Sequence, residues 1–158
     1  MPTQMATGDM LSLGCHPGDY HLGVNFDAEP FRENPFPSTC FGKDGGCDLL
    51  HIEKGQQIKN LDFRLPPSIP KHAVLGQVLL PDGRPAAKAF VSSSSRSRED
   101  FDDKLRVVAD TSGHFRVECL VGRKYRISAQ TTDSYAEGEW TIGRKMAPIT
   151  IQLKRDKR

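Results

Sequence analysis

The sequence contains no apolar run long enough to cross a bilayer, and its charge is almost balanced. Among 158 residues, 22 Lys and Arg stand against 20 Asp and Glu. Nucleic-acid-binding domains concentrate an excess of positive charge, so the composition argues against nucleic acid as a partner. The lack of long apolar segments argues against a membrane span. The N-terminal segment MPTQMATGDM has neither a basic start nor an apolar stretch, so no signal peptide is visible and the compartment stays open.

The spacings of common catalytic and zinc motifs are also missing. The five histidines are scattered without a zinc-peptidase pattern, and SSSS is not surrounded by the glycines of a nucleophile elbow. We therefore expect a protein that is not an enzyme and has no cofactor. Asp100, Asp102 and Asp103 in REDFDDK are weak candidates for calcium ligands. Because the EF-hand spacing is missing and basic residues flank the cluster, a solvated loop is the favoured interpretation.

Cysteine is scarce, with four residues in the chain. Only Cys40 and Cys47 lie close together, across the flexible loop FGKDGG, and a zinc pair would normally be closer. They are a possible disulfide, and free thiols are the alternative because the compartment is unknown. Cys119 has the inward parity of its segment, so we expect a buried thiol that behaves as a small apolar residue.

What the sequence does contain is alternation of apolar and polar residues, punctuated by turn formers. Apolar residues alternate with polar ones in HFRVECL, KYRISAQ and PITIQL, and the turn sequences PDGRP and DTSG separate such segments. No segment has a helical period. The pattern predicts an all-β fold, an antiparallel Greek-key-type sandwich of about seven strands. The segment 92–104, SSSSRSREDFDDK, is too polar for a core and is expected to be a long loop.

The segment LPPSIPKH contains three prolines and marks a domain boundary. We predict an incomplete β module over 1–66, a Pro-rich linker over 67–73, a sandwich domain over 74–154 and a basic tail over 155–158. The upstream module has three β-like pieces, DYHLGVNF, LLHIEKGQ and IKNLDFRL, with a Pro-rich aromatic loop between the first two.

An internal repeat links the two parts. Gly8 precedes Tyr20 at the spacing at which Gly113 precedes Tyr125, the following segments YHLGVN and YRISAQ match, and LDFRL matches ITIQL. We expect the first part to be the closing half of a module whose opening strands are absent. Such a half-module leaves strand edges and apolar surface uncovered. It is expected to dock on the second domain or to pair with another chain, so self-association is possible.

The second domain resembles a known family. Its array GQV, PDGRPAAKAFV, DTSGHFRV and YRISA is similar to the carboxypeptidase regulatory-like, or transthyretin-like, β-sandwich domain, common as tandem modules in bacterial envelope and secreted proteins. One departure is Lys88, where the family usually has glycine. The positions that carry the resemblance determine the fold, and they are Gly76, Asp82, Gly83, Pro85, Ala89, Asp110, Gly113, Phe115 and Tyr125.

The resemblance implies a non-catalytic module for binding, spacing or accessory roles in a larger envelope or secreted system. The partner would be a protein or a glycan. One alternative is a regulatory or folding appendage of a zinc carboxypeptidase. A further alternative is a carbohydrate-binding module, because the architecture is similar to starch-binding domains. Its aromatic candidates are Trp140, Tyr135 and Phe101, although Trp140 shares its parity with Ile142, which predicts burial.

Overall fold

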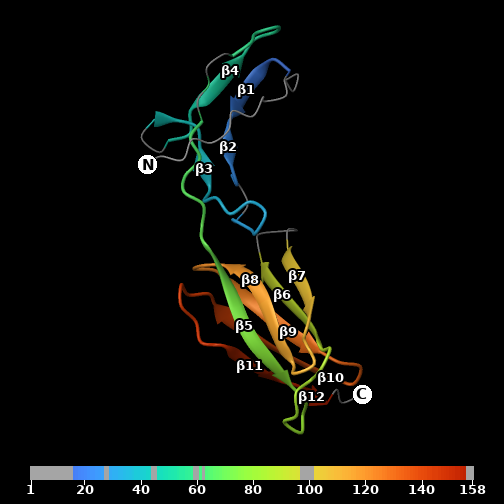
Figure 1. Ribbon diagram of the computed structural model, residues 1–158. Coiled ribbons are helices and arrows are strands. Elements are labelled where there is room, and N and C mark those ends of the chain that lie inside the picture. Colours follow the sequence, from blue (N-terminus) through green and yellow to red (C-terminus); the bar gives the residue numbers. More distant parts are fainter. Residues whose placement is uncertain are drawn as a thin grey trace. The chain divides into compact units, whose positions relative to one another are not determined.

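The computed structural model describes residues 16–26, 29–43, 46–58, 61, 63–96 and 102–155 (Figure 1). Within these ranges the secondary structure consists of β-strands, which confirms the predicted all-β class. No helix in the described ranges is long and apolar enough to cross a membrane. The chain forms two compact units, one made of Met1–Leu22 and Cys40–Phe63 and the other of Gly23–Thr39 and Arg64–Arg158.

The larger unit contains two sheets. Its strands are β5 (Lys71–Leu79), β6 (Phe90–Arg96), β7 (Asp102–Val108), β8 (His114–Leu120), β9 (Lys124–Gln130), β10 (Ser134–Thr141), β11 (Ile149–Gln152) and β12 (Lys154–Arg155). The five-stranded sheet has the order β12-β10-β9-β6-β7, and the three-stranded sheet has the order β11-β5-β8 (Figure 1). Neighbouring strands are antiparallel except β11 and β5, which are parallel. The unit is therefore a sandwich, as predicted.

The core lies between the two sheets because alternate residues of each strand point inward. Burial is complete at the inward positions predicted in β8 and β9, and the hydroxyl of buried Tyr125 accepts a hydrogen bond from the Leu120 amide at 3.1 Å. Cys119 is a fully buried thiol, as expected from its parity. Other members of the core are Val74, Val78, Val91, Phe115, Val117, Ile127, Ala129, Ile149 and Ile151.

The prediction of a loop over 92–104 is wrong at both ends of that segment. Ser92–Arg96 continue strand β6, whose ladder with β7 runs from Phe90↔Val108 to Arg96↔Asp102. Ser93 and Ser95 are 0% and 2% exposed. Serine is small, and strand pairing on both sides satisfies the backbone of a central strand, so a run of hydroxyls can enter a core when partners are present.

One such partner is Arg32, which sequence analysis did not single out. Its guanidinium donates hydrogen bonds to Ser93 Oγ at 3.3 Å and to the Glu118 carbonyl at 3.0 Å, and only 7% of the residue is exposed. It also lies 5.9 Å from the Tyr125 ring centroid. Because a buried cation is costly without partners, these contacts fix the position of the loop that carries Arg32 against the sandwich.

The observed units therefore divide the chain differently from the expected boundary at 66/67. Residues Gly23–Thr39, which include the three prolines of the Pro-rich loop, group with the sandwich. The Ile69 amide donates to the Pro35 carbonyl at 2.7 Å, and strand β5 begins at Lys71, where it pairs with Leu120. A proline prevents strand pairing only where the ladder needs the backbone N–H that proline lacks. The strand can therefore start directly after Pro70.

Two turns carry the residues of the family-like array. Asp110 Oδ1 accepts hydrogen bonds from the amides of Ser112 and His114, both at 2.8 Å, and Gly113 follows with φ +74°. Asp82 accepts from the Arg84 amide at 3.1 Å, and Gly83 has φ +86°. The glycines supply the left-handed conformation that their turns need.

The smaller unit has a different organisation. β1 (Gly18–His21) pairs with β4 (Leu49–Ile52), and a disulfide joins Cys40 and Cys47 with Cα atoms 5.0 Å apart. Phe41 and Phe63 meet edge to face at 6.4 Å between ring centroids. A second ladder joins β2 (Gly23–Val24) to β3 (Thr39–Cys40).

The strand expected in IKNLDFRL is absent among its described residues 58, 61 and 63–65. The two copies of the repeat therefore resemble each other in sequence but form different strands. YRISAQ forms one continuous central strand, whereas YHLGVN is interrupted at Leu22 between β1 and β2. The physical difference is pairing, because β9 has a neighbour on each side, whereas among the described residues β1 pairs only with β4.

Candidate functional site

The outer face of the five-stranded sheet carries a row of exposed apolar side chains. The register joins Val108 to Phe90, Phe90 to Gln130, and Gln130 to Tyr135 across β7, β6, β9 and β10. Val108 is 56% exposed, Phe90 59% and Tyr135 42%. Single exposed apolar residues are normal on a protein surface. Three of them in one row, with Gln130 between Phe90 and Tyr135, form a patch that suits a partner.

Tyr135 is held in a defined position on this face. Its hydroxyl donates a hydrogen bond to Glu137 Oε2 at 2.6 Å, and this hydrogen bond raises the pKa of the Tyr135 phenol. Residues two apart in a strand share a face. The hydrogen bond therefore holds the Tyr135 side chain toward Glu137 on the outer face.

Parallel to the apolar row lies a polar row formed by Arg106, Ser92, Ser128 and Glu137, which the register places opposite one another. These side chains offer a guanidinium, two hydroxyls and a carboxylate. The row therefore provides both donors and acceptors next to the apolar row.

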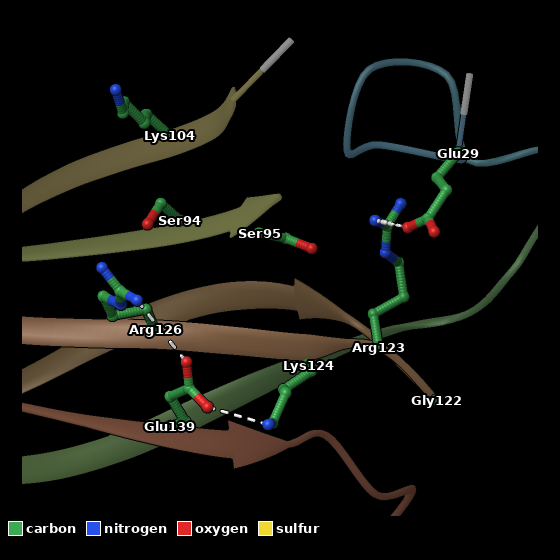
Figure 2. Close-up of a pocket in the computed structure, with 9 residues that line it drawn as sticks. All are labelled: Glu29, Ser94, Ser95, Lys104, Gly122, Arg123, Lys124, Arg126 and Glu139. Atoms are coloured by element: carbon green, nitrogen blue, oxygen red, sulfur yellow. Dashed lines mark hydrogen bonds and ion pairs between the residues drawn. The ribbon is translucent and has the colours of Figure 1, made fainter. Parts of the chain in front are cut away.

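The third row, called the basic row below, contains two cationic side chains, one carboxylate and one hydroxyl. Lys104 pairs with Ser94, Ser94 with Arg126, and Arg126 with Glu139. It borders a depression of about 640 Å³, shown in Figure 2, whose lining residues are Glu29, Ser94, Ser95, Lys104, Gly122, Arg123, Lys124, Arg126 and Glu139. Four cationic side chains and two carboxylates line it, so the depression has an excess of positive charge.

Ion pairs order this depression. Glu139 accepts from Lys124 at 2.8 Å and contacts Arg126 at 3.6 Å, and the Lys124 contact lowers the pKa of Glu139 (Figure 2). Arg123, only 10% exposed at its side chain, pairs with Glu29. The side chains of Lys124 and Arg126 stay 66% and 47% exposed, so both can approach a ligand.

The residues proposed from sequence are distributed unevenly. Tyr135 lies on the exposed face, whereas the partly buried Trp140 packs against the core with its ring close to Gly138. Trp140 is thus partly buried where its parity predicted burial, and it is not part of the face. Phe101 lies outside the described residues.

Phe90 belongs to the face but was not singled out. The signal was available, because Phe90 precedes the inward residue Val91 and therefore has outward parity.

The weak calcium candidates from the sequence fall only partly within the described residues. Asp102 and Asp103 lie in strand β7, where their backbones pair with Arg96 and Ser95, and Asp100 is outside the described residues. The described residues contain no group of three or more His, Cys, Asp or Glu side chains that could hold a metal ion.

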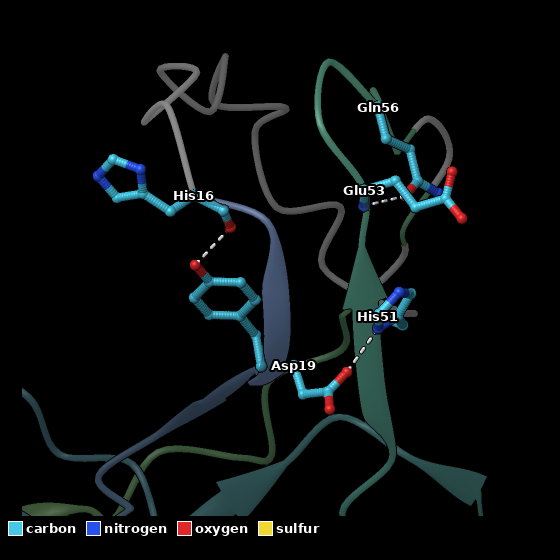
Figure 3. Close-up of polar contacts among 6 residues, drawn as sticks. His16, Asp19, His51, Glu53 and Gln56 are labelled. Carbon is cyan, nitrogen blue, oxygen red and sulfur yellow. Dashed lines mark hydrogen bonds and ion pairs between the residues drawn. The ribbon is translucent and has the colours of Figure 1, made fainter.

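The smaller unit contains one histidine–carboxylate pair, shown in Figure 3. His51 Nδ1 lies 2.6 Å from Asp19 Oδ1, and the two residues are cross-strand neighbours in β4 and β1. Catalytic pairs of this kind orient a base beside a nucleophile. Here both side chains are more than half exposed, at 68% and 56%, so we interpret the pair as cross-strand stabilisation of the ladder.

Comparison with known proteins does not assign the chain to a family. No protein-family model matches the chain, and no curated protein matches it.

Proposed function

We propose that this chain is a non-catalytic β-sandwich module that binds a partner through the outer face of its five-stranded sheet. It would act as a binding, spacing or accessory module of a larger envelope or secreted system. The observation that carries the proposal is the row of Val108, Phe90 and Tyr135, exposed on a sheet whose other face fills the core.

The character of the face supports binding more than chemistry. Catalysis in water needs a reactive group held in a protected, shaped site. The face instead combines flat apolar rings with exposed charges, an arrangement typical of recognition surfaces. The resemblance to carboxypeptidase regulatory-like domains supports the same proposal, since those domains are accessory modules without catalytic residues of their own.

The test compares the full chain with a variant in which Phe90→Ser and Tyr135→Ser remove the apolar row. The matched control is Leu75→Ser, because Leu75 is 51% exposed on β5, in the other sheet. Cosedimentation with insoluble bacterial cell-wall and extracellular-matrix preparations measures retention. We expect retention of the native chain and the control, and loss in the double variant. Equal retention of all three, or of none, contradicts the proposal.

A further inference from the structure

We infer that the ligand of the outer sheet face is an acidic polysaccharide, which stacks on the apolar row and whose anionic groups are attracted by the cationic side chains beside that row. This inference rests on the proposed function and specifies the partner. Three features of the face support it: the separation of two aromatic rings, the mixture of hydrogen-bonding groups between the rows, and the position of the positive charge.

The aromatic rings are spaced for a rigid chain of rings. Phe90 and Tyr135 both pair with Gln130 of β9, one from each side. Two strand spacings therefore separate them, roughly 9–10 Å. Sugar rings present C–H groups that pack on the negative face of an aromatic ring, and the Tyr135 side chain is held in place by its hydrogen bond to Glu137. A polymer with repeating rings can use both platforms at once, and each adds apolar contact without ordering a flexible side chain.

The polar row suits hydroxyl groups. A sugar hydroxyl both donates and accepts, so its recognition needs donors and acceptors close together. Arg106 donates, Glu137 accepts, and the hydroxyls of Ser92 and Ser128 do both. Gln130, between the two aromatic platforms, adds an amide with both capacities.

The basic row accounts for the acidic character of the ligand. Along β6, Ser94 follows Phe90 by four positions, so the basic row lies roughly 13 Å from the apolar row. Lys104, Lys124 and Arg126 border the depression there, and Arg106 lies on the way. Lysine and arginine bind carboxylate and sulfate through charge-assisted hydrogen bonds. A polymer stacked on Phe90 and Tyr135 runs parallel to the basic row, so that row attracts its anionic groups through space. Arg106, in the intervening polar row, can pair with one of them directly.

A polynucleotide would also stack and carry negative charge, but the face favours a polysaccharide. Glu137 and Glu139 stand on the same face and would repel any anionic polymer, but a sugar hydroxyl can donate a hydrogen bond to them and a phosphate diester cannot. The same carboxylates are useful acceptors for sugar hydroxyls. The formal net charge of the chain is only +2, below what non-specific nucleic-acid binding requires.

The experiment titrates the full chain, by calorimetry, with polygalacturonate and with its fully methyl-esterified form, which keeps the rings and lacks the charge. Chondroitin sulfate and desulfated chondroitin form a second matched pair, and oligo-dT is the polynucleotide arm. We expect the charged member of at least one pair to bind at least tenfold more tightly than its uncharged member, with the difference shrinking as salt rises.

The variants separate the parts of the face. Phe90→Ser should weaken binding of the charged and the uncharged polymer alike, by tenfold or more. Arg126→Gln should weaken only the charged one, by about three- to tenfold. Leu75→Ser should change neither, and circular dichroism checks that each variant is folded.

The outcomes distinguish this inference from the proposed function. Equal binding of charged and uncharged polymers, lost in Phe90→Ser, overturns the acidic ligand and leaves the binding module standing. Tighter binding of oligo-dT, or no binding of any polysaccharide while the cell-wall assay still depends on Phe90 and Tyr135, overturns the polysaccharide. Failure of the cell-wall assay as well overturns the proposed function itself.

Discussion

The two units of this chain are stabilised by different means. In the larger unit, buried side chains from both sheets form a continuous core that includes Tyr125, Ile127 and Val117, each 0% exposed. In the described part of the smaller unit, no residue belongs to that buried set. A short ladder, the Cys40–Cys47 disulfide and one aromatic contact order it instead. The comparison teaches that the same kind of sequence, short alternating segments with turns, yields a core only when strands pair on both sides and a second sheet covers them.

The difference also explains where the candidate binding face lies. When one face of a sheet packs in a core, that packing fixes the strands. The other face can then bind a partner. The ladder of β1 and β4 exposes Leu49 at 57% but has no buried side to hold it. The following predictions use substitutions in the larger unit to break or sharpen this comparison.

The largest effect is expected at Gly113. A Cβ there would lie 2.5 Å from the Val78 carbonyl oxygen, and φ is +74°. Gly113→Ala should therefore lower the free energy of unfolding of the sandwich by roughly 2–4 kcal/mol. Urea unfolding followed by the fluorescence of Trp140, the single tryptophan, measures it, because Trp140 packs against the core.

Gly83→Ala is the matched control for steric crowding. Its φ is +86°, but no atom lies within 4 Å of an added Cβ. Only backbone strain remains, which costs roughly 1 kcal/mol. Equal losses at both glycines would show that the close approach to Val78 does not matter.

The next effect concerns the loop that carries Arg32. Arg32→Ala removes its hydrogen bonds to Ser93 and to the Glu118 carbonyl, so the sandwich should lose roughly 1.5–3 kcal/mol. Arg116→Ala, which removes a guanidinium whose side chain is 65% exposed, should change stability by less than about 0.5 kcal/mol. If Arg32→Ala is as mild as Arg116→Ala, residues 23–39 do not belong to the stable unit.

A gain is expected at Lys88. This residue has φ +59°, a left-handed conformation that costs a residue with a Cβ roughly 1 kcal/mol. Lys88→Gly relieves that cost and should raise the free energy of unfolding by up to about 1 kcal/mol, less the extra entropy of glycine in the unfolded chain. Thermal unfolding measures the change, and Lys88→Ala, which keeps the Cβ, should bring no gain. A loss in Lys88→Gly would contradict the account.

The smallest effect is a pH dependence at Asp110. Hydrogen bonds from the backbone amides, that of His114 first, lower the pKa of Asp110 below its ordinary value. A carboxyl whose pKa is lower in the folded state contributes stability above its unfolded pKa, near 4, and loses it as the pH falls through the folded pKa. Asp110→Asn keeps an acceptor oxygen and removes the charge.

The stability difference between the native chain and Asp110→Asn should therefore be largest at neutral pH and should shrink below about pH 4. Denaturant unfolding at a series of pH values measures it. A difference that stays constant down to acid pH would mean that the ionised carboxylate contributes nothing.

Much of the sandwich could be predicted from sequence, for a physical reason. Inward positions such as Phe115, Tyr125 and Ile151 follow a period of two, and Asp110 and Gly113 mark a turn by local chemistry. The predictions that failed concern residues whose burial depends on contacts far along the chain. Ser93 could not be recognised as a core residue without Arg32, and the burial of Arg32 depends on Ser93 and Glu118, far along the chain.

The candidate face was only partly predictable. Tyr135 was found from its residue type, but its neighbours Phe90 and Val108 became a patch only through the register of β6, β7, β9 and β10. Strand register is set by the packing of the whole sheet, so the sequence of one strand alone does not determine it. Self-association through the first 66 residues stays a prediction.

The most direct test of the difference between the two units is native-state hydrogen exchange on the full chain and on its Cys40→Ser, Cys47→Ser variant. A disulfide that closes so short a loop contributes about 2.5 kcal/mol, so its removal should speed exchange of the β1 and β4 amides by roughly 50–100-fold. The amides of β8 and β9 should remain the slowest in both proteins, with unchanged rates. If the β1 and β4 amides of the variant stay as slow as those of β9, or if β9 loses protection with them, the account of two differently stabilised units is contradicted.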